Sequence, residues 1–93
     1  MPTPLTPEER TALAGEHPSW NIDGEAISRT FAFGDFGEAM GFVNRVALAA
    51  EKADHHPDID IRWNEVTLTL STHSAGALTE LDRQIVETVD GWV

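Results

Sequence analysis

Residues 35–54 form the segment of this sequence that most restricts the fold. Asp35 has the properties of a helix N-cap, and apolar residues follow it at the spacing of three and four that is typical of an amphipathic helix. These residues are Phe36, Met40, Val43, Val46, Ala47 and Ala50. The pattern predicts one long helix, ending at about Asp54, with a single apolar face that other elements must cover.

Extended segments lie on both sides of this helix, and they come in pairs. Each pair is joined by a short polar stretch, which is the pattern of an antiparallel hairpin. In the second extended segment Ile27, Phe31 and Phe33 share one face. The predicted hairpins are Trp20–Ile22 with Glu25–Phe33 around the turn Asp23-Gly24, and Asp58–Trp63 with Val66–Ser71 around Asn64-Glu65.

Two further helices are predicted near the ends of the chain. Thr6 can cap a short helix that runs to about Gly15, with Pro7 at its first position. Thr79 can cap the last helix, whose buried side is marked by Leu81, Ile85, Val89 and Trp92. The order helix, two strands, helix, two strands, helix indicates an α+β fold, in which three helices pack on one face of a four-stranded antiparallel sheet.

Size and charge restrict the classes of function. Ninety-three residues are expected to form a single domain, 1–93, and a domain of this size gains stability from association with further copies. The net charge of −10 argues against general binding to nucleic acid or to an anionic membrane. With no cysteine, no secretory signal and no apolar segment long enough to cross a bilayer, the protein is expected to be cytoplasmic.

Three of the four histidines are candidates for a reactive site. His55 and His56 are adjacent where the long helix ends, and His73 lies just past the last strand, so both positions can meet at one rim of the sheet. Imidazole has an ordinary pKa of about 6.5 and can therefore act as acid or base near neutral pH. Asp82 can orient a nearby imidazole, and Glu51 lies one helical turn before His55. The pattern favours general acid–base catalysis.

A metal site is the main alternative reading of the same histidines. Three imidazoles and a carboxylate are plausible zinc ligands. However, adjacent side chains in an extended segment point apart, and the usual spacings HxH and HxxxH are missing from this sequence. No metal and no cofactor are therefore expected, and His17 is expected to have no chemical role.

The residues around these histidines resemble the signature of the pterin-4a-carbinolamine dehydratase family. That signature begins with a charged residue, has His-His-Pro after three more residues, and continues with an aromatic residue, a further histidine and an aspartate. Here the corresponding positions are Glu51, His55-His56-Pro57, Trp63, His73 and Asp82. Phe31-Ala32-Phe33, Gly41–Leu48 and Leu70–His73 also look like family sequence, so the resemblance extends from about Trp20 to the last residue.

The resemblance implies a fold, a reaction and an assembly. The implied fold is a four-stranded antiparallel sheet with three helices, and the implied assembly is a homodimer or homotetramer. The implied reaction converts a 4a-hydroxytetrahydropterin to quinonoid dihydropterin and water. This dehydration recycles the cofactor of aromatic amino-acid hydroxylases, so a functional link to such an enzyme is expected.

The resemblance also implies a role for each site residue. His55 and His73 would be the main acid–base residues, and His56 would chiefly hold the substrate. Glu51 and Asp82 would support the histidines, with Asp82 counted as part of the catalytic set. The residues that would line or border the pterin site are Asp54, Ser71, Thr72, Ser74 and Trp20.

Two other functions are compatible with the same sequence. Some relatives act as dimerisation partners of transcription factors or as assembly factors, so a binding module on this fold is one alternative. The other is a pterin-related enzyme of molybdenum-cofactor metabolism. The first alternative gives no reason to keep three site histidines together with Asp82, whereas the second would share the residues that recognise the pterin ring.

Overall fold

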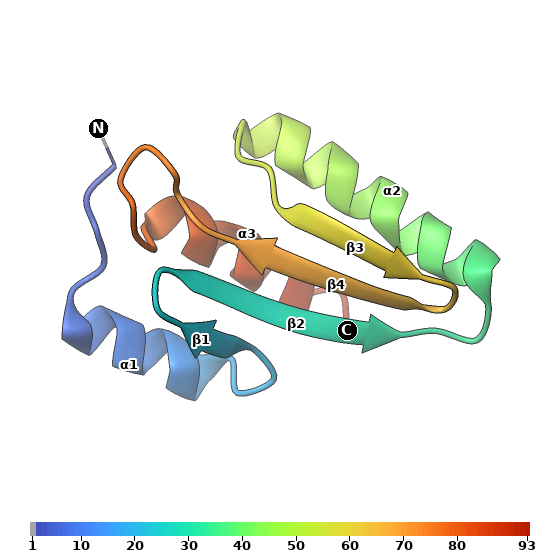
Figure 1. Ribbon diagram of the computed structural model, residues 1–93, viewed down its shortest axis with the longest axis horizontal. Coiled ribbons are helices and arrows are strands. Elements are labelled where there is room, and N and C mark those ends of the chain that lie inside the picture. The colour runs from blue at the N-terminus through green and yellow to red at the C-terminus, as the bar shows by residue number, and fades with distance from the viewer. Residues whose placement is uncertain (1) are drawn as a thin grey trace.

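The computed structural model describes residues 2–93 and shows three helices and four strands in the predicted order (Figure 1). The sheet is antiparallel throughout and has the strand order β1-β2-β4-β3. The predicted fold class is therefore confirmed. The elements are α1 (Pro7–Glu16), β1 (Asn21–Asp23), β2 (Ala26–Ala32), α2 (Phe36–Ala53), β3 (Asp58–Arg62), β4 (Glu65–Leu70) and α3 (Glu80–Asp90).

The core lies between the sheet and the helices. β2 and β4 form the centre of the sheet and pair from Ile27 opposite Leu70 to Ala32 opposite Glu65. α3 lies behind the sheet, and α2 runs alongside β3 and packs against α3, while α1 lies beside β1 and adds Leu13 to the same core (Figure 1). The fully buried side chains of β2 and β4 are Ile27, Val66, Leu68 and Leu70.

Both hairpin turns lie one residue away from their predicted positions. Asp23 pairs with Ala26, so the first turn is Gly24-Glu25 rather than Asp23-Gly24. Gly24 has φ +62°, a conformation that costs glycine little, and this places the glycine at the first turn position. Similarly, Arg62 pairs with Glu65, so residues 63–64 form the second turn instead of Asn64-Glu65.

The buried face of α2 differs from the predicted stripe. Phe36 and Ala47 are exposed, although their spacing predicted burial. Ala39 is buried instead, and Phe42 packs against Phe31 with ring centroids 4.7 Å apart. Helical spacing gives the period of the stripe but not its exact rotation, which is set here by the aromatic residues that fill the space between sheet and helix.

The two terminal helices begin as predicted. In α1 the Thr6 side chain accepts from the Glu9 backbone N–H and the Glu9 carboxylate accepts from the Thr6 N–H, at 3.1 and 2.8 Å. α3 has the same reciprocal arrangement between Thr79 and Asp82. Its predicted buried side needs correction, because Val86 is buried while Leu81 and Trp92 are only partly so. None of the described helices is long and apolar enough to cross a membrane.

Candidate active site

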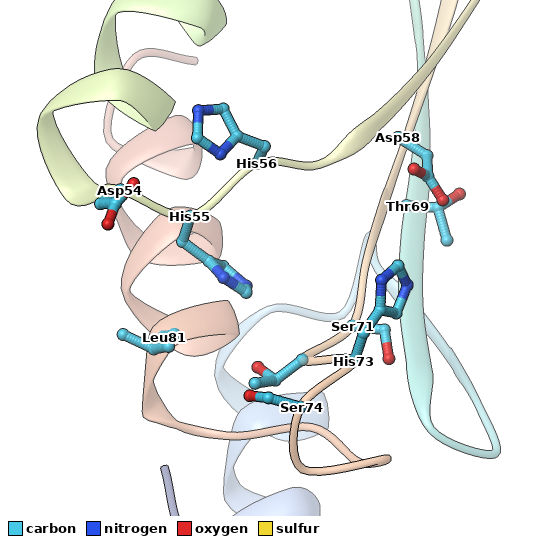
Figure 2. A pocket seen from close by; sticks show the side chains of 10 residues that line it. Asp54, His55, His56, Asp58, Thr69, Ser71, His73, Ser74 and Leu81 are labelled. Carbon is cyan, nitrogen blue, oxygen red and sulfur yellow. The ribbon is translucent and has the colours of Figure 1, made fainter. Parts of the chain in front are cut away.

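A cavity of about 360 Å³ lies at one rim of the sheet, where the end of α2, the start of β3, the loop after β4 and the first turn of α3 meet. Figure 2 shows the side chains around it. Residues that are far apart in the sequence converge here, including all three histidines of the predicted set. The lining residues are Asp54, His55, His56, Asp58, Thr69, Ser71, Thr72, His73, Ser74 and Leu81.

Asp54 is the residue that turns the chain into this site. It ends α2 in the left-handed conformation, with φ 52° and ψ 42°, and its N–H bonds to carbonyls of the last helical turn. Aspartate tolerates this conformation better than most residues that carry a Cβ. The His55 N–H then bonds to the Ala50 carbonyl at 3.1 Å. The histidine pair therefore leaves the helix in a fixed direction.

His55 is held by a buried carboxylate. Its Nε2 lies 2.6 Å from Oδ1 of Asp82, and the two side chains are 11% and 0% exposed. A carboxylate removed from water needs hydrogen-bond donors to remain ionised. Asp82 has them, because its other oxygen, Oδ2, accepts from the Thr72 hydroxyl at 2.8 Å and from the Thr79 N–H at 2.9 Å. Asp82 therefore supports His55 from below the cavity without lining it.

His56 differs from His55 in both direction and exposure. Its ring turns away from the other two imidazoles (Figure 2), and Nε2 lies 2.5 Å from Oε2 of Glu51. Their side chains are 56% and 74% exposed. Glu51 was expected to share a helix face with His55, but α2 ends at Ala53 and Glu51 contacts His56 instead. Glu51 does not line the cavity.

His73 reaches the cavity from the loop after β4. Thr72 and Ala77 form an isolated antiparallel bridge across the base of this loop, and Gly76 closes it with φ +61°. The ring of His73 stands on the opposite side of the cavity from that of His55 (Figure 2). The structure therefore places two imidazoles so that they can face a molecule bound between them.

Trp20 was predicted to border the pterin, and its position requires a correction. It is buried in the core, where its ring packs edge-on against Phe31, and it is not among the residues that line the cavity. Its indole N–H donates to Oδ1 of Asp90 at 2.7 Å. Aromatic character suits both a core position and a ligand site, so the sequence could not distinguish them.

Asp90 is the centre of a second cluster that the sequence did not predict. Oδ2 lies 2.6 Å from Nδ1 of His17, and Oδ1 also accepts from Arg29 at 2.9 Å. Partial burial acts to raise the pKa of Asp90, but the hydrogen bonds from Trp20 and His17 and the charge of Arg29 outweigh it, so the pKa lies below its ordinary value. This cluster joins α1, β1 and β2 to the end of α3.

Three lining residues were missing from the predicted site: Asp58, Thr69 and Leu81. Asp58 and Thr69 are paired across β3 and β4. The strand alternation could have suggested Thr69, because it places the threonines of β4 opposite to the core. Asp58 and Leu81 depend on the packing of β3 and α3, which no local pattern specifies.

One group within residues 2–93 has ligand atoms close enough together to bind a metal ion, and none of its residues lines the cavity. It consists of Glu16, His17 and Glu87. Arg83 lies 4.0 Å from the Glu16 carboxylate and 3.3 Å from that of Glu87, so a guanidinium already pairs with both carboxylates and offsets part of their charge.

Comparison with known proteins identifies the family. The family model described as pterin 4 alpha carbinolamine dehydratase matches residues 3–92. The chain belongs to this family. A relative from Nocardia farcinica, named as a pterin-4-alpha-carbinolamine dehydratase, is 50% identical over 91 residues, which are 97% of this chain and 96% of that protein. A relative of the same name from Thermomicrobium roseum is 56% identical over 71 residues, or 76% of each chain.

Solved structures of the dehydratase family agree with this fold. A crystal structure of a transcriptional coactivator/pterin dehydratase from Brucella melitensis superimposes with a TM-score of 0.90 and 40% identity, covering 96% of this chain and 97% of that one. A more distant structure is a pterin dehydratase-like protein identified as a RuBisCO assembly factor in the alpha-carboxysome. It has a TM-score of 0.67 and 28% identity, over 78% of this chain and 87% of that one.

Proposed function

We propose that this protein is a dehydratase that converts a 4a-hydroxytetrahydropterin to quinonoid dihydropterin and water. One observation carries the proposal: His55 and His73, which are far apart in the sequence, stand on opposite sides of one cavity (Figure 2), and a buried aspartate holds His55. The family match and the names of the relatives support the same reaction.

The chemistry needs two proton transfers at adjacent atoms. The bond between the ring carbon and its hydroxyl breaks as the hydroxyl receives a proton, and the neighbouring ring nitrogen loses its proton so that a carbon–nitrogen double bond forms. Water leaves, and no net proton is gained or lost. Two imidazoles on opposite sides of the ring can perform these transfers, one as donor and one as acceptor.

The other lining residues have roles in holding the substrate. His56, with Glu51 behind it, stands at the exposed side of the cavity, while Asp54, Ser71 and Ser74 offer polar groups around it. A pterin presents several N–H donors and ring acceptors, which such groups can recognise. A homodimer or homotetramer, a cytoplasmic location and a link to an aromatic amino-acid hydroxylase remain predictions made from the sequence.

The test is an assay of quinonoid dihydropterin formation with the wild-type protein and with His73→Ala. We expect the variant to lose about 10²–10⁴-fold in kcat, the usual contribution of a general acid or base. His17→Ala is the matched control, because this histidine lies in the other cluster, and it should retain the wild-type kcat. Equal rates for wild type and His73→Ala would refute the role of His73.

A binding or assembly module is the second candidate, and the relative identified as a RuBisCO assembly factor is the observation in its favour. That structure is less similar to this chain than the pterin dehydratase from Brucella melitensis. A purified protein that binds a partner in fixed ratio but does not accelerate the dehydration would favour the module. If the protein turned over another pterin but not the 4a-hydroxytetrahydropterin, this result would favour an enzyme of molybdenum-cofactor metabolism.

A further inference from the structure

Behind His55 lies a chain of hydrogen bonds whose donors and acceptors can all be assigned. Thr72 Oγ1 lies 2.8 Å from Asp82 Oδ2 and 2.8 Å from Thr79 Oγ1. An ionised carboxylate only accepts, so the single hydroxyl proton of Thr72 must go to Asp82. The Thr79 hydroxyl must then donate to Thr72, while it accepts from the Leu81 N–H at 3.2 Å. The chain therefore runs in one direction, from Thr79 to Thr72 to Asp82.

This assignment also determines the state of the His55 ring. Oδ2 of Asp82 accepts from Thr72 and from the Thr79 N–H, which leaves Oδ1 to accept from His55. The proton of a neutral His55 ring must therefore be on Nε2, and Nδ1 carries the free lone pair. Within residues 2–93, no buried side-chain nitrogen or oxygen lacks a partner, and Asp82 is the only partner of this ring, so Nδ1 is open to the solvent of the cavity.

Thr72 occupies a position where it cannot serve the substrate through its hydroxyl. Its side chain is nearly inaccessible, its proton is given to Asp82, and its backbone is paired with Ala77. It was expected to line the substrate site, and it is among the residues that line the cavity. Its hydroxyl, however, is bonded to Asp82 behind the histidine, where it fixes the orientation of the carboxylate.

We propose that Thr72 and Thr79 are positioning residues, which hold Asp82 so that His55 keeps its own proton on Nε2, while a second proton passes between the substrate and Nδ1. The role in turnover rests on the proposed function. The assignment of the ring does not, because it follows from the hydrogen bonds alone. Two experiments separate the two claims.

The first experiment is ¹⁵N NMR of the His55 ring in the wild-type protein without substrate. We expect the directly bonded proton on Nε2, with Nδ1 resonating as an unprotonated nitrogen in the neutral ring. A neutral ring with its proton on Nδ1 would overturn the assignment. This result is independent of turnover. If the protein had no dehydratase activity, the proposed function would be refuted, whereas the ring assignment would still be decided by the spectrum.

The second experiment compares Thr72→Val with Thr72→Ser and with Thr67→Val. Valine keeps the shape of threonine but removes the donor to Asp82, so we expect kcat to fall roughly tenfold with KM little changed, and the Nε2 proton of His55 to exchange faster with water. Serine restores the donor and should keep kcat within about twofold of wild type. Thr67→Val is the control: it also removes a threonine hydroxyl, here one on β4 that lies 2.7 Å from the Thr30 hydroxyl on β2. That pair of hydroxyls is not hydrogen-bonded to Asp82.

The pattern of the three variants decides the proposal. A loss of kcat in Thr72→Val that serine rescues and Thr67→Val does not share would support the positioning role. Wild-type kcat and proton exchange in a folded Thr72→Val would overturn it. If Thr72→Val does not fold, Thr72→Ser and the wild-type NMR spectrum still test the proposal. An inactive Thr72→Ser enzyme would contradict the assigned chain of hydrogen bonds. A proton on Nδ1 of His55 in the wild-type spectrum would contradict it as well.

Discussion

Two aspartates of α3, Asp82 and Asp90, each pair with a histidine from elsewhere in the chain, and the two pairs have the same hydrogen-bond distance but different surroundings. His55 Nε2 and Asp82 Oδ1 are 2.6 Å apart in the first turn of the helix, and His17 Nδ1 and Asp90 Oδ2 are 2.6 Å apart at its last residue. The first pair stands at the 360 Å³ cavity, whereas His17 and Asp90 line no part of that cavity. Bond length alone therefore does not identify a reactive histidine.

The partners of the two carboxylates explain the difference. Asp82 is inaccessible to solvent and accepts from a hydroxyl and a backbone N–H at a helix N-terminus, where the helix dipole favours negative charge. Asp90 is 18% exposed at the opposite end, where the dipole disfavours negative charge, and it pairs with Arg29 and Trp20. The first pair leaves a histidine nitrogen open to a cavity, while the second ties elements of the fold together.

The largest expected difference between the pairs is in catalysis. His55→Ala removes an imidazole from the cavity and should lower kcat about 10²–10⁴-fold. His17→Ala should leave kcat unchanged, because it lies outside the cavity, while it lowers stability by about 1 kcal/mol through the lost bond to Asp90. Steady-state kinetics on both purified variants measure the two values of kcat. A comparable loss of kcat in both variants would contradict the distinction between a catalytic and a structural histidine.

The second largest difference is in the free energy of unfolding. Asp82→Asn places an amide against a fully buried set of donors and should cost about 2–4 kcal/mol. Asp90→Asn affects a partly exposed group and should cost about 1 kcal/mol. Urea denaturation followed by circular dichroism measures both, and a larger loss for Asp90→Asn would contradict the ranking.

A smaller effect is expected in the pH dependence of stability at Asp90. The pKa of Asp90 is lower in the folded chain than its ordinary value, because hydrogen bonds from Trp20 and His17 and the charge of Arg29 outweigh the effect of burial. A lowered pKa stabilises the fold above the unfolded value of about 3.9, and the stabilisation declines as the pH falls below it. The difference in unfolding free energy between wild type and Asp90→Asn should thus narrow below about pH 4. A difference that is constant from pH 7 to about pH 3 would contradict this.

The smallest effect is expected at the third histidine contact. His56 and Glu51 are both exposed, so water screens their interaction. Glu51→Gln should change the free energy of unfolding by less than about 0.5 kcal/mol, and any effect should be on KM rather than on stability. Thermal denaturation and substrate titration check the two parts, and a loss of stability as large as that of Asp82→Asn would be inconsistent with the exposure.

Much of the fold followed from local patterns, and the exceptions have physical causes. The N-caps at Thr6, Asp35 and Thr79 were correct because a cap depends on neighbouring residues. The turns after β1 and β3 were displaced by one residue because pairing across the sheet decides the register. Phe36 was expected inside and lies outside, since the rotation of α2 depends on its packing partners.

The site was predictable in its histidines but not in its surroundings. His55, His56 and His73 lie at the predicted cavity, and Asp82 contacts His55. The contact of Glu51 with His56, the burial of Trp20 and the presence of Asp58 in the lining depend on how the elements pack, which sequence spacing does not specify.

The central claim is that His55 and His73 act on one pterin bound between them, and imidazole NMR during titration with a dihydropterin tests it most directly. The resonances of His55 and His73 should shift together along a single saturation curve, and those of His17 should stay in place. Movement of His17 with no change at His55 and His73, or no change in any ring at saturating dihydropterin, would contradict the account.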